Sequence, residues 1–166
     1  MATLKIGSAK LKLDHLAVIV KDMDKALAFY SKAFGIKFEE VQQHDLPPDV
    51  IYKGKPSPYT MKVTFGQMGP VRLEMVQVVK GKGKCIYTDF LKQYGEGFHH
   101  LGFEVDDLEK EVANAKSQGL KMICFLKMVG IMAFAHFDAV KTNGLRIELV
   151  QKDVRDKIMK KLAEGG

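Results

Sequence analysis

An internal repeat is the feature of this sequence that most restricts the fold. Residues 13–25 read LDHLAVIVKDMDK, and residues 98–110 read FHHLGFEVDDLEK. At an offset of 85 residues, the two segments share His15 with His100, Leu16 with Leu101, Val20 with Val105, Asp22 with Asp107 and Lys25 with Lys110. A second pair of similar segments follows, RLEMVQ at 72–77 and RIELVQ at 146–151. Each copy therefore opens on a histidine and closes on a glutamate.

Two copies are too few for a solenoid, which needs about three or more stacked units to bury a core. They fit two fused modules, which we place at residues 12–79 and 97–152, with a connector at 80–96. His15 and Glu74 are 59 residues apart, whereas His100 and Glu148 are 48 apart. The first module is therefore longer, and four prolines between residues 44 and 59 indicate that the surplus is a loop.

The composition fits a single globular domain over residues 1–166, with 46% apolar and 28% charged residues. No apolar run reaches about 18 residues and no signal-peptide pattern is present, so we expect a cytoplasmic protein without a membrane span. Cys85 and Cys124 form no CxxC pair, which argues against a disulfide framework or a zinc knuckle. The net charge of +6 is spread over scattered lysines, which argues against nucleic-acid binding and suits an anionic small molecule.

Hydrophobic periodicity and capping residues predict the order βαβββ twice, an α+β fold. In the first module we expect a strand at 13–20, a helix from Asp22 to Gly35, a strand at 36–42 and a hairpin of 60–65 with 71–79. The connector carries a short helix at 87–94. The second module repeats the order with strands at 99–105, 121–125, 131–138 and 145–151, and a helix that starts after Asp107. A C-terminal helix is predicted at 153–164.

The alternation of side chains along the strands places the polar residues of each copy on one face. His15 shares a face with Ala17 and Ile19 and points away from the more apolar face formed by Leu16, Val18 and Val20. His100 takes the equivalent place in the second copy, and His99 is expected to face the opposite way.

A charged residue within an apolar strand is costly unless it is paired or bound to a cation, and Glu74 and Glu148 both occupy such positions. If the modules pair about a pseudo-twofold axis, these carboxylates converge with His15 and His100. Two imidazoles and two carboxylates make a six-coordinate site for a divalent ion. We interpret the isolated His44 and His136 as polar residues satisfied by other groups, and Glu104 as a salt-bridge partner.

Residues 12–152 resemble the vicinal-oxygen-chelate superfamily, which includes glyoxalase I, methylmalonyl-CoA epimerase and the extradiol dioxygenases. The segment GFHHLGFEVDD at 97–107 is most similar to the epimerase branch. The resemblance implies two βαβββ modules that form a cup-shaped mixed sheet around one divalent ion, Co, Ni, Mn or Zn. It transfers the metal ligands to His15, Glu74, His100 and Glu148, with Glu148 also the catalytic base. Family members commonly dimerise, so a homodimer is expected.

The sequence departs from the epimerase pattern at two places. The strand predicted before the first hairpin turn, YTMKVTF at 59–65, carries no carboxylate for a second base, and a His-Pro or Asp-Pro pair is replaced by HFDA at 136–139. The leading hypothesis is a metal-dependent isomerase or lyase that removes a proton next to a metal-polarised carbonyl of an acyl-CoA or similar thioester. The alternatives are lactoylglutathione lyase, acting on a glutathione adduct, and a metal-free binding or resistance protein. The fourth ligand, a second carboxylate, argues against a 2-His-1-carboxylate dioxygenase.

Overall fold

A computed structural model describes residues 3–6, 9–81, 83–128 and 130–151 of the chain. The predicted helix at 153–164 lies outside these residues. The elements are β1 (Thr3–Ile6), β2 (Ala9–Ile19), α1 (Met23–Phe34), β3 (Gln42–Leu46), β4 (Ile51–Tyr52), β5 (Lys55–Pro56), β6 (Tyr59–Met68), β7 (Val71–Gly81), α2 (Ile86–Tyr94), β8 (Gly97–Val105), α3 (Leu108–Ser117), β9 (Met122–Met128), β10 (Met132–Phe137) and β11 (Ile147–Gln151).

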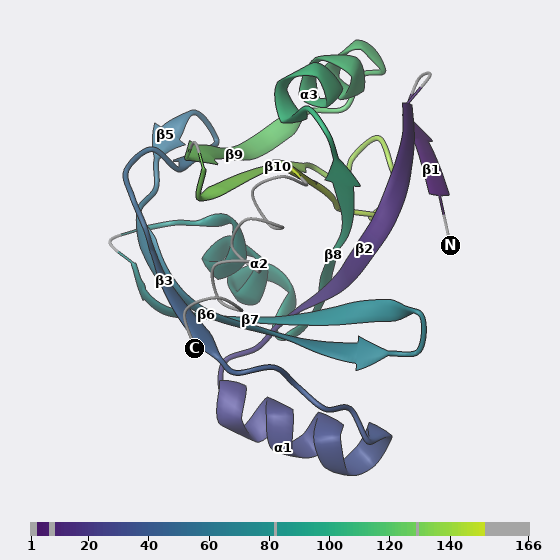
Figure 1. The fold of residues 1–166 in the computed structure, drawn as a ribbon. Coiled ribbons are helices and arrows are strands. Elements are labelled where there is room, and N and C mark those ends of the chain that lie inside the picture. Colours follow the sequence, from purple (N-terminus) through teal and green to yellow (C-terminus); the bar gives the residue numbers. More distant parts are fainter. Residues whose placement is uncertain (1–2, 7–8, 82, 129, 152–166) are drawn as a thin grey trace.

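The strands of the described residues form one mixed sheet that curls around an interior (Figure 1). Its order is β3-β6-β7-β2-β8-β11-β10-β9-β4-β5, with β1 paired to β2. The strands β3-β6-β7-β2 come from the first copy of the repeat, β8-β11-β10-β9 from the second copy mirror them, and β4 and β5 from the first copy extend the far edge. Each half contains one parallel pair, β2 with β7 and β8 with β11, and the halves join through the antiparallel pair β2–β8. The predicted α+β fold class is confirmed.

The segment predicted as a loop, residues 44–59, contains strands. Residues 36–41 form only an isolated bridge at Phe38, and the strand predicted there is instead β3, which starts at Gln42. After β3 the chain crosses to the far edge of the sheet, where Ile51 and Tyr52 of β4 pair with β9. The proline-based interpretation was wrong for the residues in β3, β4 and β5. Pro56 lies in β5, an edge strand that tolerates a missing N–H donor, whereas Pro47, Pro48 and Pro58 lie between strands as predicted.

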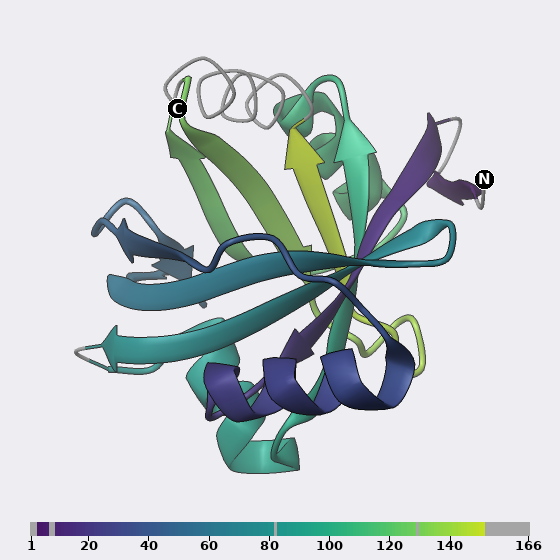
Figure 2. The same ribbon diagram turned by 60° about the horizontal axis from the view of Figure 1, so that its bottom comes forward.

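The helices begin and end where their capping residues predicted. Asp22 and Asp107 each accept a hydrogen bond from the backbone N–H three residues later, and Gly35 ends α1 with φ 66°. Helices α1 and α3 lie on opposite sides of the molecule in both views (Figure 1, Figure 2). No helix in the described ranges is long and apolar enough to cross a membrane.

Helix α2 fills one end of the cup. Its buried residues Ile86, Tyr87 and Phe90 pack against inward-facing residues of the sheet such as Ile19 and Val76. The inner face, which carries His15, is therefore the more deeply buried one, and His15 faces away from Leu16 and Val18 as predicted. Ala17 and Ile19, which share its face, are fully buried, whereas the outer Leu16 and Val18 are only partly covered by α1.

Leu108 at the start of α3 is fully buried against the outer face of the second half of the sheet, so truncating it should open a cavity. We expect Leu108→Ala to lower the free energy of unfolding by about 2–5 kcal/mol. Val140→Ala is the control, because Val140 is 79% exposed and should change stability by less than about 0.5 kcal/mol. Urea unfolding checks both, and equal effects would contradict the packing described for α3.

Candidate metal centre

The four predicted ligands lie on four neighbouring strands at the centre of the sheet. Glu74 is on β7, His15 on β2, His100 on β8 and Glu148 on β11. Ala17 stands opposite both Glu74 and His100, and Gly102 stands opposite both His15 and Glu148. Ala17 and Gly102 are themselves related by the repeat. The small side chains thus leave room for the imidazoles and carboxylates beside them, a role that the sequence reading missed.

The functional atoms of these residues face one another. Nε2 of His15 and Nε2 of His100 are 3.1 Å apart, and Oε2 of Glu148 is 3.1 Å from both. Oε2 of Glu74 is 3.6 Å from both. Ligand atoms at right angles on an ion with bonds of about 2.1 Å would be about 3.0 Å apart. His15, His100 and Glu148 have this spacing, and Glu74 lies somewhat farther away, while the role of all four as ligands stays a prediction.

Each histidine of the pair is held by the residue before it in the chain. The pairing of β2 with β8 is irregular at Asp14 and at His99, which are equivalent positions of the repeat. At these bulges the usual alternation of faces breaks, so Asp14 turns inward beside His15 and His99 inward beside His100. The prediction that His99 faces the opposite way was therefore wrong.

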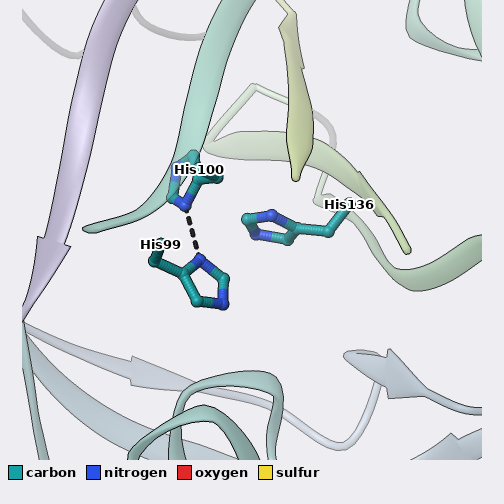
Figure 3. A group of neighbouring side chains, drawn as sticks. All are labelled: His99, His100 and His136. Carbon is teal, nitrogen blue, oxygen red and sulfur yellow. Dashed lines mark hydrogen bonds between the residues drawn. The ribbon is translucent and has the colours of Figure 1, made fainter. Parts of the chain in front are cut away.

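The two bulged residues contact the Nδ1 atoms of the histidines. Nδ1 of His15 donates to Oδ2 of Asp14 at 2.9 Å, and the Nδ1 atoms of His99 and His100 are 2.8 Å apart (Figure 3). A partner on Nδ1 fixes the ring and leaves Nε2 free for an ion. Both imidazoles therefore present Nε2 to the shared centre.

His136 is an unpredicted member of this cluster. It is fully buried on β10 opposite Glu148 on β11, and its Nε2 is 3.1 Å from Oε1 of that carboxylate. Neither ring nitrogen has an aligned hydrogen-bond partner among the described residues, but Nε2 faces the Glu148 carboxylate, so the interpretation of His136 as a polar residue satisfied by another group stays a prediction. Two other interpretations can be compared with the structure. Glu104 pairs with Lys12 at 3.3 Å as expected, and His44 on β3 lines the cavity beside the centre.

The charges of the cluster are strongly coupled. Burial opposes a charge on His15, but Glu74, Asp14 and Glu148 outweigh it and raise its pKa to about 10. Burial raises the pKa of Glu74 to about 7 and lowers that of His100 to about 4. Glu148 has a pKa well below its usual value despite its burial, because His136 and His100 stabilise the carboxylate. One positive charge among these carboxylates is thus favoured, as it would be for a bound cation.

A cavity of about 150 Å³ opens beside the cluster. Glu74, Glu148 and His15 lie at its wall, and much of the remaining wall is apolar, formed by Met61, Val63, Phe65, Met132, Phe134 and Val150. Arg72 stacks over Phe65 at 4.0 Å and approaches Asp14 and Glu39. Two imidazoles and two carboxylates at the base of such a cavity fit a divalent ion of the Mn, Co, Ni or Zn type.

Residues 14–136 match the family model described as the Glyoxalase/Bleomycin resistance protein/Dioxygenase superfamily. The match covers most of the chain, which therefore belongs to this superfamily. The predicted resemblance is confirmed at this level.

The relatives include enzymes of different activities, among them an epimerase, a lyase, a dehydratase and a dioxygenase. The mitochondrial methylmalonyl-CoA epimerase of Homo sapiens is 26% identical over 112 residues, which are 68% of this chain and 56% of that protein. The lactoylglutathione lyase of Schizosaccharomyces pombe is 26% identical over 146 residues, 85% of this chain and 47% of that protein. The chain thus spans about half the length of these two relatives. In structure, the methylmalonyl-CoA epimerase of Mycobacterium tuberculosis shares the fold, with a TM-score of 0.62, 18% identity, and coverage of 91% and 92% of the two chains.

Gly102 offers a direct test of the centre, because a Cβ atom there would overlap the imidazole of His15. We expect Gly102→Ala to displace that ring and to weaken divalent-metal binding at least tenfold. Gly66→Ala is the control, since its Cβ would instead meet Ile36 and Phe38 on the outer face and cost about 1–3 kcal/mol of stability without loss of metal. Metal titration measures the loss of affinity expected in Gly102→Ala, and thermal unfolding measures the loss of stability expected in Gly66→Ala. Unchanged metal affinity in Gly102→Ala would contradict the proposed place of His15 in the metal centre.

Metal uptake should depend on pH, because His15 must lose its proton before it binds an ion. With its pKa raised to about 10, this proton is present at neutral pH and competes with the metal. The apparent affinity should therefore fall as pH decreases, by about tenfold per unit for each proton displaced. Calorimetric titration between pH 6 and 8, in buffers of different protonation enthalpy, measures the released protons. Affinity that is independent of pH would contradict the electrostatics described.

Proposed function

We propose that the protein is a divalent-metal-dependent isomerase or lyase, similar to methylmalonyl-CoA epimerase, that removes a proton beside a carbonyl group. The observation that carries this proposal is the convergence of His15, Glu74, His100 and Glu148 at the base of a cavity. The epimerase and lyase named among its relatives support it. A metal-free binding protein would gain nothing from two buried carboxylates and two buried imidazoles at one point.

The ion supplies Lewis-acid polarisation of the carbonyl oxygen when it is bound. Glu148 is the proposed base. It lines the cavity and, with its lowered pKa, is ionised at neutral pH. Its carboxylate takes the proton of the carbon next to the carbonyl, so that the C–H bond breaks and an O–H bond forms on Glu148.

No second carboxylate lies on the wall formed by β6. Its residues on the cavity are Met61, Val63, Thr64 and Phe65. Glu39 and Glu40 also line the cavity, and Glu39 is 3.6 Å from Arg72. Return of the proton to the opposite side of the carbon therefore depends on water or on a group at the rim. We expect exchange with solvent to be faster than net epimerisation.

The substrate class in this proposal is an acyl-CoA or a similar thioester. A glutathione adduct, the substrate class of lactoylglutathione lyase, is the second candidate, because the same residues would serve proton transfer in either molecule. A homodimer also belongs to the proposal, as an expectation taken from the superfamily. Analytical sedimentation that shows a monomer at high micromolar concentration would contradict the expected homodimer.

Proton exchange tests the reaction. In heavy water, the metal-loaded protein should exchange the proton next to the thioester carbonyl of methylmalonyl-CoA, as followed by NMR, and Glu148→Gln should abolish this exchange. Glu104→Gln is the matched control, because Glu104 pairs with Lys12 and does not line the cavity.

Other outcomes reassign the function. Turnover of the methylglyoxal–glutathione adduct without exchange in the acyl-CoA would favour the lyase. A protein that takes up no added Mn, Co, Ni or Zn would favour the metal-free binding protein and contradict the proposal.

A further inference from the structure

The two carboxylates of the centre have different neighbours, although the repeat relates them. On the first half of the sheet Glu74 pairs with Phe65 of β6, and on the second half Glu148 pairs with His136 of β10. Phe65 and His136 thus occupy equivalent places beside the two carboxylates. An apolar ring stands at one and an imidazole at the other, so only Glu148 has a possible hydrogen-bond donor on that side.

The contacts of Glu148 use its two oxygens for different purposes. Oε2 is 3.1 Å from Nε2 of both His15 and His100, where the ion would bind. Oε1 points away from that centre and is 3.1 Å from Nε2 of His136. Oε2 of Glu74 is 3.6 Å from Nε2 of both histidines, and Phe65 beside it packs edge-on against His15 with ring centroids 5.9 Å apart.

The ring of His136 is confined by its neighbours. The rings of His100 and His99 lie beside it with centroids 4.9 and 6.0 Å away (Figure 3), and those of Phe134 and Tyr87 lie 5.4 and 6.1 Å away. A fully buried imidazole without an aligned partner costs about 1–3 kcal/mol, so its position needs an explanation other than packing. The carboxylate oxygen at 3.1 Å is the acceptor that a small rotation of either group would align.

We propose that His136 is a positioning residue for Glu148. Its Nε2–H donates to Oε1, holds the plane of the carboxylate and leaves Oε2 alone to bind the ion. Glu74 has no such donor from its neighbouring strand, so the second half of the centre is the preorganised one. The inference rests on the metal centre of the proposed function but not on the identity of the reaction.

His136→Phe tests this directly, because it copies the arrangement around Glu74 onto Glu148. We expect it to weaken the affinity for Ni²⁺ or Co²⁺, measured by competition with a chromophoric chelator, by about 10- to 100-fold. It should also change the visible spectrum of the Co²⁺ protein. His136→Gln, which keeps a donor near the position of Nε2, should restore most of the affinity and the spectrum. His44→Phe is the matched control, a half-buried histidine of the same cavity outside the cluster, and should leave both unchanged.

Thermal unfolding of the metal-free variants separates positioning from packing. The inference is supported if metal affinity and the Co²⁺ spectrum are lost in His136→Phe and regained in His136→Gln. The melting temperatures of the two variants should stay similar. Wild-type affinity in His136→Phe would overturn it, and so would equal losses in Phe and Gln that follow their melting temperatures. A wild-type protein that binds no divalent ion would overturn both this inference and the proposed function. Metal binding without proton exchange would overturn the proposed reaction alone, and the affinity series would still decide the role of His136.

Discussion

The antiparallel pairing of β2 with β8 is the constraint on which the rest of the site depends. It joins the two halves of the sheet and brings two histidines that are 85 residues apart to 3.1 Å between their Nε2 atoms. The bulges at Asp14 and His99 turn one extra polar side chain inward behind each imidazole. Because β7 and β11 pair in parallel with these central strands, their glutamates approach the same point from either side.

The electrostatics of the cluster explain why such a costly arrangement persists in a buried place. Carboxylates and imidazoles placed this close compensate one another only if a positive charge lies among them. In the metal-free cluster that charge is a proton on His15, whose pKa is raised to about 10. A divalent ion would replace this proton with a larger positive charge at the same point. The buried carboxylates therefore favour the uptake of a metal ion and of a proton through the same electrostatic attraction.

The two halves of the site differ, although the repeat relates them. Helix α2 fills one end of the cup, and the cavity is lined by its Tyr87 together with residues of β3, β6, β10 and β11. The replacement of an apolar ring by His136 beside Glu148 makes the second carboxylate differ from the first. A symmetric scaffold thus holds an asymmetric cluster of side chains.

The sequence by itself determined the repeat, the α+β class, the capped helices and the four residues that converge, because these follow from local periodicity and from identical residues at one offset. Only the tertiary structure decided the neighbours that depend on strand register. Nine residues separate Phe65 from Glu74 but twelve separate His136 from Glu148, so no single offset aligns them. The inward turn of His99 comes from a bulge, and the pairing of β4 with β9 joins strands from opposite halves of the chain. Such contacts are set by hydrogen bonding between distant strands, which a one-dimensional pattern of polarity does not encode.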